Sequence, residues 1–144
     1  MDMRHRVTRS VVATALLALV TAVPASAAAT SVTIDIHVDF TLGETFTASG
    51  ICPEGDAVSY GHHVTGVGRA TVFHLYKDLV CEDGSGTITI RVDASSVFGM
   101  SGTIGGWSVV SGTGDYAGLR GGGHIVGTAF DGGIDDHYTG KLTN

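Results

Sequence analysis

Short runs in which apolar and polar residues alternate cover most of the chain after residue 30. In Ser31–Phe40 every second residue is apolar, and Thr87–Asp93 repeats this alternation. Side chains of a β-strand point alternately to the two faces of a sheet, so each run predicts a strand with one buried face. Further strands are predicted over residues 44–50, 57–65, 67–79, 97–110 with a glycine interruption, 124–130 and 134–142.

Tight turns separate these runs. The sequence holds 22 glycines, and segments such as Cys52–Asp56 and Glu82–Gly86 have the composition of turns. No window after the first 30 residues shows a helical period. Eight short strands joined by tight turns predict an all-β antiparallel sandwich or barrel. We favour an eight-stranded antiparallel up-and-down barrel of the calycin-like kind, because closure removes the exposed edges of a sheet.

Residues 1–28 have the layout of a secretory signal peptide. Three arginines precede an uncharged apolar run over residues 11–23, and Ala25-Ser26-Ala27 is a small-residue cleavage motif. The run is shorter than the roughly 20 apolar residues of a membrane-spanning helix. We therefore expect a secreted protein in which residues 29–144 form a single β-barrel domain, with no membrane attachment after cleavage.

The charge balance of the predicted mature chain is acidic. With residues 1–28 removed, five of the eight Lys and Arg residues and 13 of the 14 Asp and Glu residues remain. Nucleic acids and anionic membrane surfaces attract basic proteins, so neither is expected as a partner. The oligomeric state does not follow from this sequence.

Cys52 and Cys81 are the two cysteines of the chain. An even number of cysteines in an exported protein predicts a disulfide. The alternative is a reactive or metal-bound thiol. It is disfavoured because the neighbours of Cys52, Pro53 and Glu54, supply no positive charge that would lower the pKa of a thiol.

The glycine-rich stretch Ser111–Gly123 lies between two predicted strands, and we interpret it as a structural turn. We expect Tyr116 to cover one end of the barrel with its ring and to hydrogen-bond through its hydroxyl. Arg120 is expected to pair with Asp115 or with an acid of the last strand. A phosphate-binding loop is rejected, because the spacing fails the G-x-G-x-x-G fingerprint and the stretch precedes a strand instead of a helix. The turn residues are Gly112, Gly114, Tyr116, Gly118 and Gly121.

Two patterns near the C-terminus carry a family resemblance. The turn pattern G-[ST]-G-x-[YF]-x-G-x-x-G is matched from Gly112 to Gly121, and a Y-x-G-x-L pattern is matched from Tyr138 to Leu142. In these patterns the chain resembles the allene oxide cyclase and dirigent-like β-barrel superfamily. The resemblance implies an eight-stranded antiparallel barrel with an apolar cavity. Members include plant cyclases, phenoxy-coupling guides and bacterial polyketide cyclases. The patterns mark the fold, so catalytic residues stay unassigned.

Candidate ligand-binding residues are the polar side chains expected to line the barrel lumen. His124 shares a face with Val126 and Thr128, and Asp136 shares a face with Tyr138. An ordinary structural role is the alternative for each candidate. The candidates are Tyr76, His124, Asp136 and Tyr138.

No metal site and no cofactor is predicted. Asp35, His37 and Asp39 share the face opposite to the apolar one, which predicts a solvated outer surface. The hydrolase motifs G-x-S-x-G and H-E-x-x-H are missing from the sequence.

Three functions fit these observations. The first is a secreted barrel that binds a small apolar molecule in its lumen. The second is a cyclase or isomerase of the allene oxide cyclase or dirigent type, whose cavity folds a small hydrophobic substrate into a reactive shape. The third is a structural or protein-interaction barrel with a filled lumen. The sequence leaves open whether the protein is an enzyme.

Overall fold

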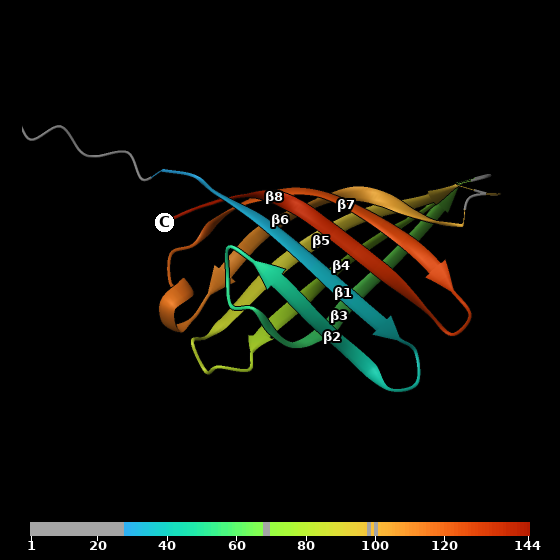
Figure 1. Cartoon of the computed structure of the whole chain (residues 1–144). Helices are drawn as coiled ribbons and strands as arrows, with labels where there is room; N and C mark the ends of the chain where they lie inside the picture. Colours follow the sequence, from blue (N-terminus) through green and yellow to red (C-terminus); the bar gives the residue numbers. More distant parts are fainter. Residues whose placement is uncertain (1–27, 68–69, 98, 100) are drawn as a thin grey trace, which may run out of the picture.

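The computed structural model describes residues 28–67, 70–97, 99 and 101–144, which form a closed antiparallel barrel (Figure 1). Each strand pairs with its neighbours in the sequence, and β8 closes the barrel against β1. The predicted eight-stranded up-and-down barrel is therefore confirmed. The predicted signal peptide and its cleavage motif lie outside the described residues. The strands are β1 (Thr30–Asp39), β2 (Gly43–Ser49), β3 (Glu54–Val67), β4 (Ala70–Cys81), β5 (Thr87–Val97), β6 (Gly102–Gly112), β7 (Arg120–Phe130) and β8 (Gly133–Thr143).

Several predicted strand boundaries differ from the structure. β3 begins at Glu54, β4 runs over Ala70–Cys81 instead of residues 67–79, and β7 begins at Arg120 instead of residue 124. β5 continues to Val97, and β6 begins at Gly102, so the predicted segment over residues 97–110 belongs to two strands. Glycines such as Gly105 do not interrupt β6. Glycine is needed there because the backbone of the adjacent strand occupies the space where a side chain would project. A Cβ atom at Gly105 would collide with the carbonyl oxygen of Asp93 on β5. Here glycine permits close packing between strands.

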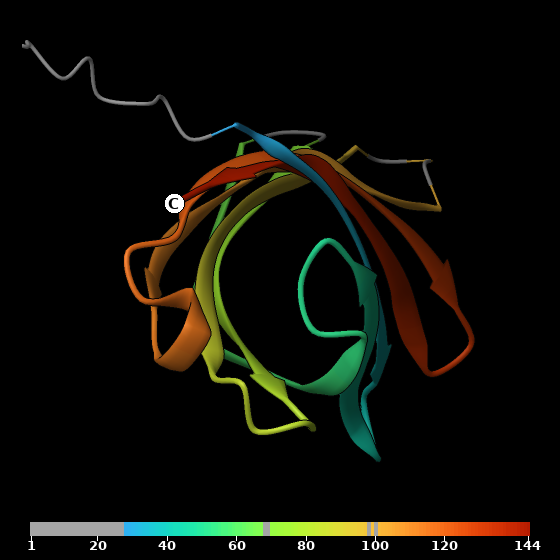
Figure 2. The same cartoon turned by 60° about the vertical axis from the view of Figure 1, so that its left-hand side comes forward.

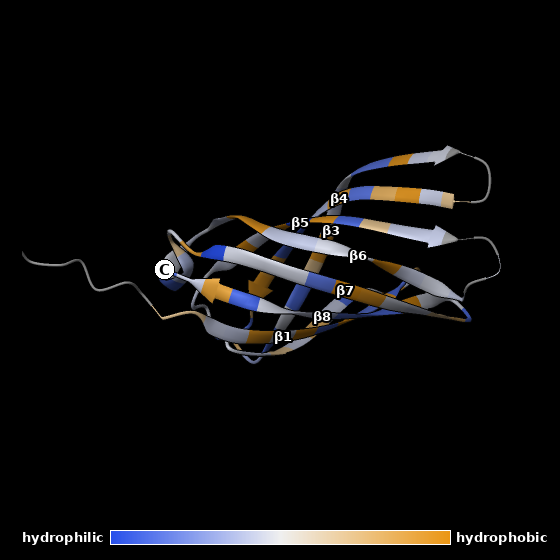
Figure 3. Ribbon diagram, turned by 90° about the horizontal axis from the view of Figure 1, so that it is seen from above, coloured by the Kyte–Doolittle hydropathy of each residue, from blue (hydrophilic) through white to orange (hydrophobic). Residues whose placement is uncertain are grey.

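The barrel core is built by the alternating apolar residues of the strands (Figure 3). Ile34, Ile36 and Ile90 are almost completely buried, as the alternation predicts. Trp107 of β6 packs edge-on against Tyr138 of β8, with the ring centroids 6.2 Å apart. The indole nitrogen of Trp107 also donates a hydrogen bond to the carbonyl oxygen of Thr139 at 3.2 Å. These large rings help to fill the interior of the barrel.

The loop between β2 and β3 turns inward at one end of the barrel (Figure 2). In this loop Cys52 is buried, and its sulfur forms the predicted disulfide with Cys81 at the end of β4. The Cα atoms of the two cysteines are 5.9 Å apart. The disulfide indicates a non-reducing environment.

The glycine-rich stretch forms a turn at this same end. A short 3₁₀ helix, η1 (Gly114–Tyr116), follows β6. The predicted hydrogen bonding of the Tyr116 hydroxyl is confirmed, because this hydroxyl accepts a hydrogen bond from the backbone N–H of Cys52 at 2.9 Å and lies 3.3 Å from the hydroxyl of Ser85.

The predicted turn glycines have two different roles, and two of them, Gly112 and Gly121, lie in β6 and β7 instead of in the turn itself. Gly114, Gly118 and Gly121 have positive φ angles, which favour glycine. Gly112 has no positive φ. It lies so close to the carbonyl oxygen of Tyr116 that a Cβ atom would not fit. The predicted pairing of Arg120 is wrong: its side chain is exposed and enters none of the ion pairs found among the described residues.

Candidate functional site

The lumen contains a cavity of about 410 Å³ toward the end that carries the β1–β2 and β7–β8 turns. We call it the lumen cavity. Most of its wall is apolar, with Phe73 and Leu75 from β4, Val92 from β5, and Ile125 and Ile134 from β7 and β8. Its volume falls within the range of about 300–1,000 Å³ that is usual for small-molecule sites.

Three polar side chains on the inner face of β2, β3 and β4 face this cavity. The Nζ atom of Lys77 lies 2.6 Å from Oε2 of Glu44 and donates a hydrogen bond to Oγ of Ser59 at 2.7 Å. The Ser59 hydroxyl in turn donates to the same Glu44 oxygen at 2.9 Å. These contacts form a closed triangle of one cation, one anion and one hydroxyl. Lys77 is only 3% exposed, and burial of a lysine is tolerated because the charge is paired.

Two residues of β8 complete what we call the lumen polar cluster, defined as Glu44, Ser59, Lys77, Asp136 and Tyr138. The hydroxyl of Tyr138 donates a hydrogen bond to Oδ2 of Asp136 at 3.4 Å. Both residues are buried and line the lumen cavity.

Burial changes the acidity of both β8 residues. Burial raises the pKa of the Asp136 carboxyl, although the positive charge of Lys77 acts in the opposite direction. Burial, and next the Asp136 charge, raises the pKa of Tyr138 well above its usual value. Tyr138 is therefore a neutral hydroxyl at physiological pH.

The structure brings together two of the four residues predicted to line the lumen. Asp136 and Tyr138 lie inside, but the predicted lumen positions of Tyr76 and His124 are wrong. Tyr76 lies on the outer face of β4, where its ring stacks on Tyr60 with centroids 5.8 Å apart. His124 is exposed on the outer face of β7, and its neighbour Ile125 is buried and faces the cavity.

Sequence reasoning missed Glu44, Ser59 and Lys77. The signal available in β4 was weak: Lys77 shares its face with Leu75 and Leu79, but the opposite face carries apolar residues as well. A charged residue in that position opposes the usual preference of lysine for solvent. The buried position of Lys77 is explained by Glu44, whose carboxylate lies beside its ammonium group.

The outer face of β1 and β8 carries two reciprocal His–Asp pairs. His37 and Asp135 are cross-strand neighbours with Nδ1 and Oδ1 2.6 Å apart, and His137 lies 2.5 Å from Asp35. All four side chains are more than half exposed, which confirms the predicted solvated surface. In the part of the chain that the structure describes, no group of three or more His, Cys, Asp or Glu residues could hold a metal ion.

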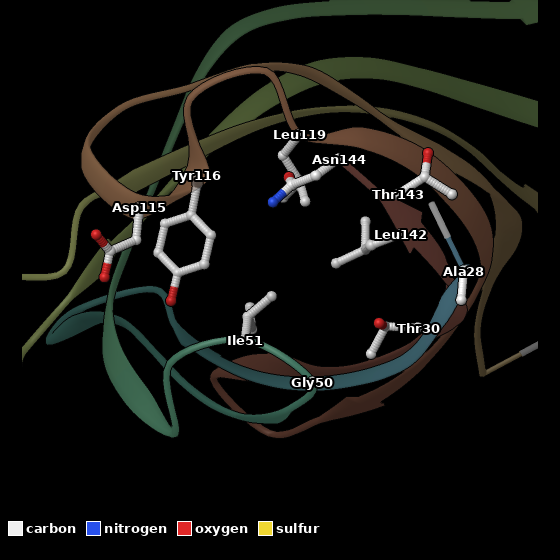
Figure 4. A pocket seen from close by; sticks show the side chains of 10 residues that line it. All are labelled: Ala28, Thr30, Gly50, Ile51, Asp115, Tyr116, Leu119, Leu142, Thr143 and Asn144. Atoms are coloured by element: carbon white, nitrogen blue, oxygen red, sulfur yellow. The ribbon is translucent and has the colours of Figure 1, made fainter. Parts of the chain in front are cut away.

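A second hollow of about 250 Å³ lies at the disulfide end of the barrel (Figure 4). Ile51, Tyr116, Leu119 and Leu142 contribute side chains to it, together with residues at both ends of the described chain. Asp115, an acidic residue that lines this hollow, is exposed to solvent. The lumen cavity is the stronger candidate site, because Lys77, Asp136 and Tyr138 are buried, Glu44 and Ser59 are partly buried, and hydrogen bonds hold them in place.

Comparison of the chain with protein-family models, curated proteins and solved structures gave no match. Over the described ranges, no helix is long and apolar enough to cross a membrane.

Proposed function

We propose that this protein binds a small, mainly apolar molecule in the lumen cavity. One observation carries the proposal: an apolar-walled cavity of about 410 Å³ lies beside the largely buried lumen polar cluster inside a closed barrel. Eight-stranded barrels of this size can hold one small ligand. The cavity also counts against the hypothesis of a structural barrel with a filled lumen.

Secretion is part of this proposal. The Cys52–Cys81 disulfide supports it, because such bonds persist in oxidising compartments. Membership of the allene oxide cyclase and dirigent-like superfamily remains a proposal, which the closed eight-stranded barrel supports. Native mass spectrometry of protein recovered from the medium of its own host tests both secretion and binding. We expect a chain that begins near Ala28 and retains a small molecule.

A binding titration tests the lumen cavity directly. The uncharged fluorophore N-phenyl-1-naphthylamine should bind the protein and increase in fluorescence. Ala94 is buried and lines the cavity, so Ala94→Phe should fill part of it and abolish binding. Val126→Phe places the same ring on the outer face of β7 and should leave binding unchanged, because Val126 is 52% exposed. Equal binding by the two variants would refute a lumen site.

The buried acids also favour a second candidate function, an isomerase or cyclase. Glu44 and Asp136 are carboxyl groups in different surroundings, one paired with Lys77 and the other with its pKa raised by burial. Such a difference can provide a base and an acid beside the same bound substrate. Turnover of a retained ligand by purified protein would support catalysis, and recovery of the ligand unchanged would support binding alone.

A further inference from the structure

The lumen polar cluster has an uneven distribution of charge. Glu44 and Lys77 form an ion pair, and Ser59 bonds to both. Asp136 enters none of the ion pairs among the described residues, and Tyr138 is its hydrogen-bond donor. The cluster therefore holds two carboxyl groups and a single ammonium group.

In the described part of the chain, this arrangement leaves no unpaired Lys or Arg in the cavity for an anionic ligand. Among the residues that the structure describes, Lys77 is the one Lys or Arg that lines the lumen cavity, and its ammonium group is already paired with Glu44 at 2.6 Å. His62 also lines the cavity, but it is exposed to solvent. A ligand carboxylate would lose its water and meet the carboxyl groups of Glu44 and Asp136. Burial of a charge without a partner is strongly unfavourable.

The same cluster can bind an uncharged oxygen atom of a ligand. An ammonium group has three N–H donors, and Lys77 uses two of them on Glu44 and Ser59, so one remains for a ligand. Asp136 accepts a hydrogen bond when ionised and also donates one when protonated. A hydroxyl or carbonyl oxygen can therefore be bound without any change in the net charge of the cluster.

We propose that the lumen polar cluster selects uncharged apolar molecules that carry a hydroxyl or carbonyl oxygen, and excludes the corresponding carboxylates. This inference rests on the proposed binding function. The Glu44–Lys77 pair is the specificity determinant, because it neutralises the Lys77 ammonium group, which would otherwise attract an anion.

Competition at pH 7.5 tests the inference with three ligands that share one alkyl chain. 1-Decanol, decanoate and decylamine are each used to displace N-phenyl-1-naphthylamine. We expect 1-decanol to bind at least tenfold more tightly than decanoate. Decylamine should also bind more tightly than decanoate, because its ammonium group can pair with the Asp136 carboxylate. An apolar cavity without the polar cluster would also bind the alcohol more tightly than the carboxylate. Variants of the cluster are therefore needed to distinguish the two explanations.

Glu44→Gln is the deciding variant, because it leaves the Lys77 ammonium without its anion. The ratio of decanoate to 1-decanol affinity should rise at least tenfold. Glu54→Gln is the matched control, since Glu54 is exposed and does not line the lumen cavity, and its ratio should not change. Asp136→Asn is a second variant that keeps the Glu44–Lys77 pair and removes the other carboxylate. It should raise the ratio by a smaller factor.

The outcomes separate this inference from the proposed function. Fluorophore binding with an unchanged ratio in both Glu44→Gln and Asp136→Asn would overturn the specificity role and leave the binding function standing. Tighter binding of decanoate than of 1-decanol by the unmodified protein would also overturn it. Failure of the unmodified protein to take up the fluorophore and all three decyl ligands would overturn the binding function itself.

Discussion

The hydroxyl of Tyr116 accepts a hydrogen bond from the backbone N–H of Cys52 at 2.9 Å, although 64 positions separate the two residues. This contact joins the glycine-rich turn to the disulfide loop. Ser85, in the turn between β4 and β5, lies 3.3 Å from the same hydroxyl. One phenol group thus connects three loops at the disulfide end of the barrel.

Removal of the Tyr116 hydroxyl should destabilise the protein without changing its fold. Tyr116→Phe leaves the N–H of the buried Cys52 without its acceptor, which costs about 1–3 kcal/mol. Urea unfolding followed by tryptophan fluorescence measures the loss. Tyr76→Phe is the control, because Tyr76 lies on the outer face, and its stability should stay within about 0.5 kcal/mol. Equal losses in the two variants would contradict the role of Tyr116.

The disulfide should contribute more than this hydrogen bond. Cys52 and Cys81 are separated by 29 positions, and the chain-entropy model gives about 3–4 kcal/mol for a loop of that length. The double variant Cys52→Ala and Cys81→Ala should lose stability of that order in urea unfolding. The unmodified protein should lose a similar amount in the presence of a reductant, and the double variant should then lose nothing further. A double variant as stable as the oxidised protein would show that the bond adds no stability.

Loss of Lys77 should be costly, because Glu44 would remain as a buried charge without a partner. Removal of one member of a buried ion pair typically costs about 3–5 kcal/mol. We expect Lys77→Met to lose stability of this size in chemical unfolding. Combination with Glu44→Gln removes the unpaired charge and should recover part of the loss. A double variant less stable than Lys77→Met would argue that the pair is not energetically coupled.

The stability effect of Asp136→Asn should depend on pH. Burial raises the pKa of Asp136 in the folded protein, so folding favours the protonated acid, and this contribution is lost as the pH rises through the raised pKa. Asn resembles the protonated form. Asp136→Asn should therefore raise the thermal midpoint relative to the unmodified protein at pH 8, and the difference should shrink at pH 4.

A surface variant controls for general charge effects in that experiment. Asp131 lies in the exposed turn between β7 and β8, and Asp131→Asn should show no comparable pH dependence. If Asp136→Asn lowered the thermal midpoint at pH 8, the ionised carboxylate would have to be stabilising in the folded state.

The sequence alone determined the strand count, the turn and the disulfide. Alternation in Ser31–Phe40 and Thr87–Asp93 is unambiguous, because apolar residues occupy a single face of each run. Positive φ angles at Gly114 and Gly118 explain why local glycine spacing could identify the turn. These features depend on interactions between near neighbours in the chain, or on the presence of a single cysteine pair.

The tertiary structure alone decided which polar side chains share the lumen. In β4 apolar residues occupy both faces, so alternation could not determine whether Tyr76 or Lys77 points inward. The choice depends on Glu44, which lies 33 positions away and reaches Lys77 only because β2, β3 and β4 pair side by side. Burial of a charge requires a partner, and a partner on another strand is fixed only when the barrel closes.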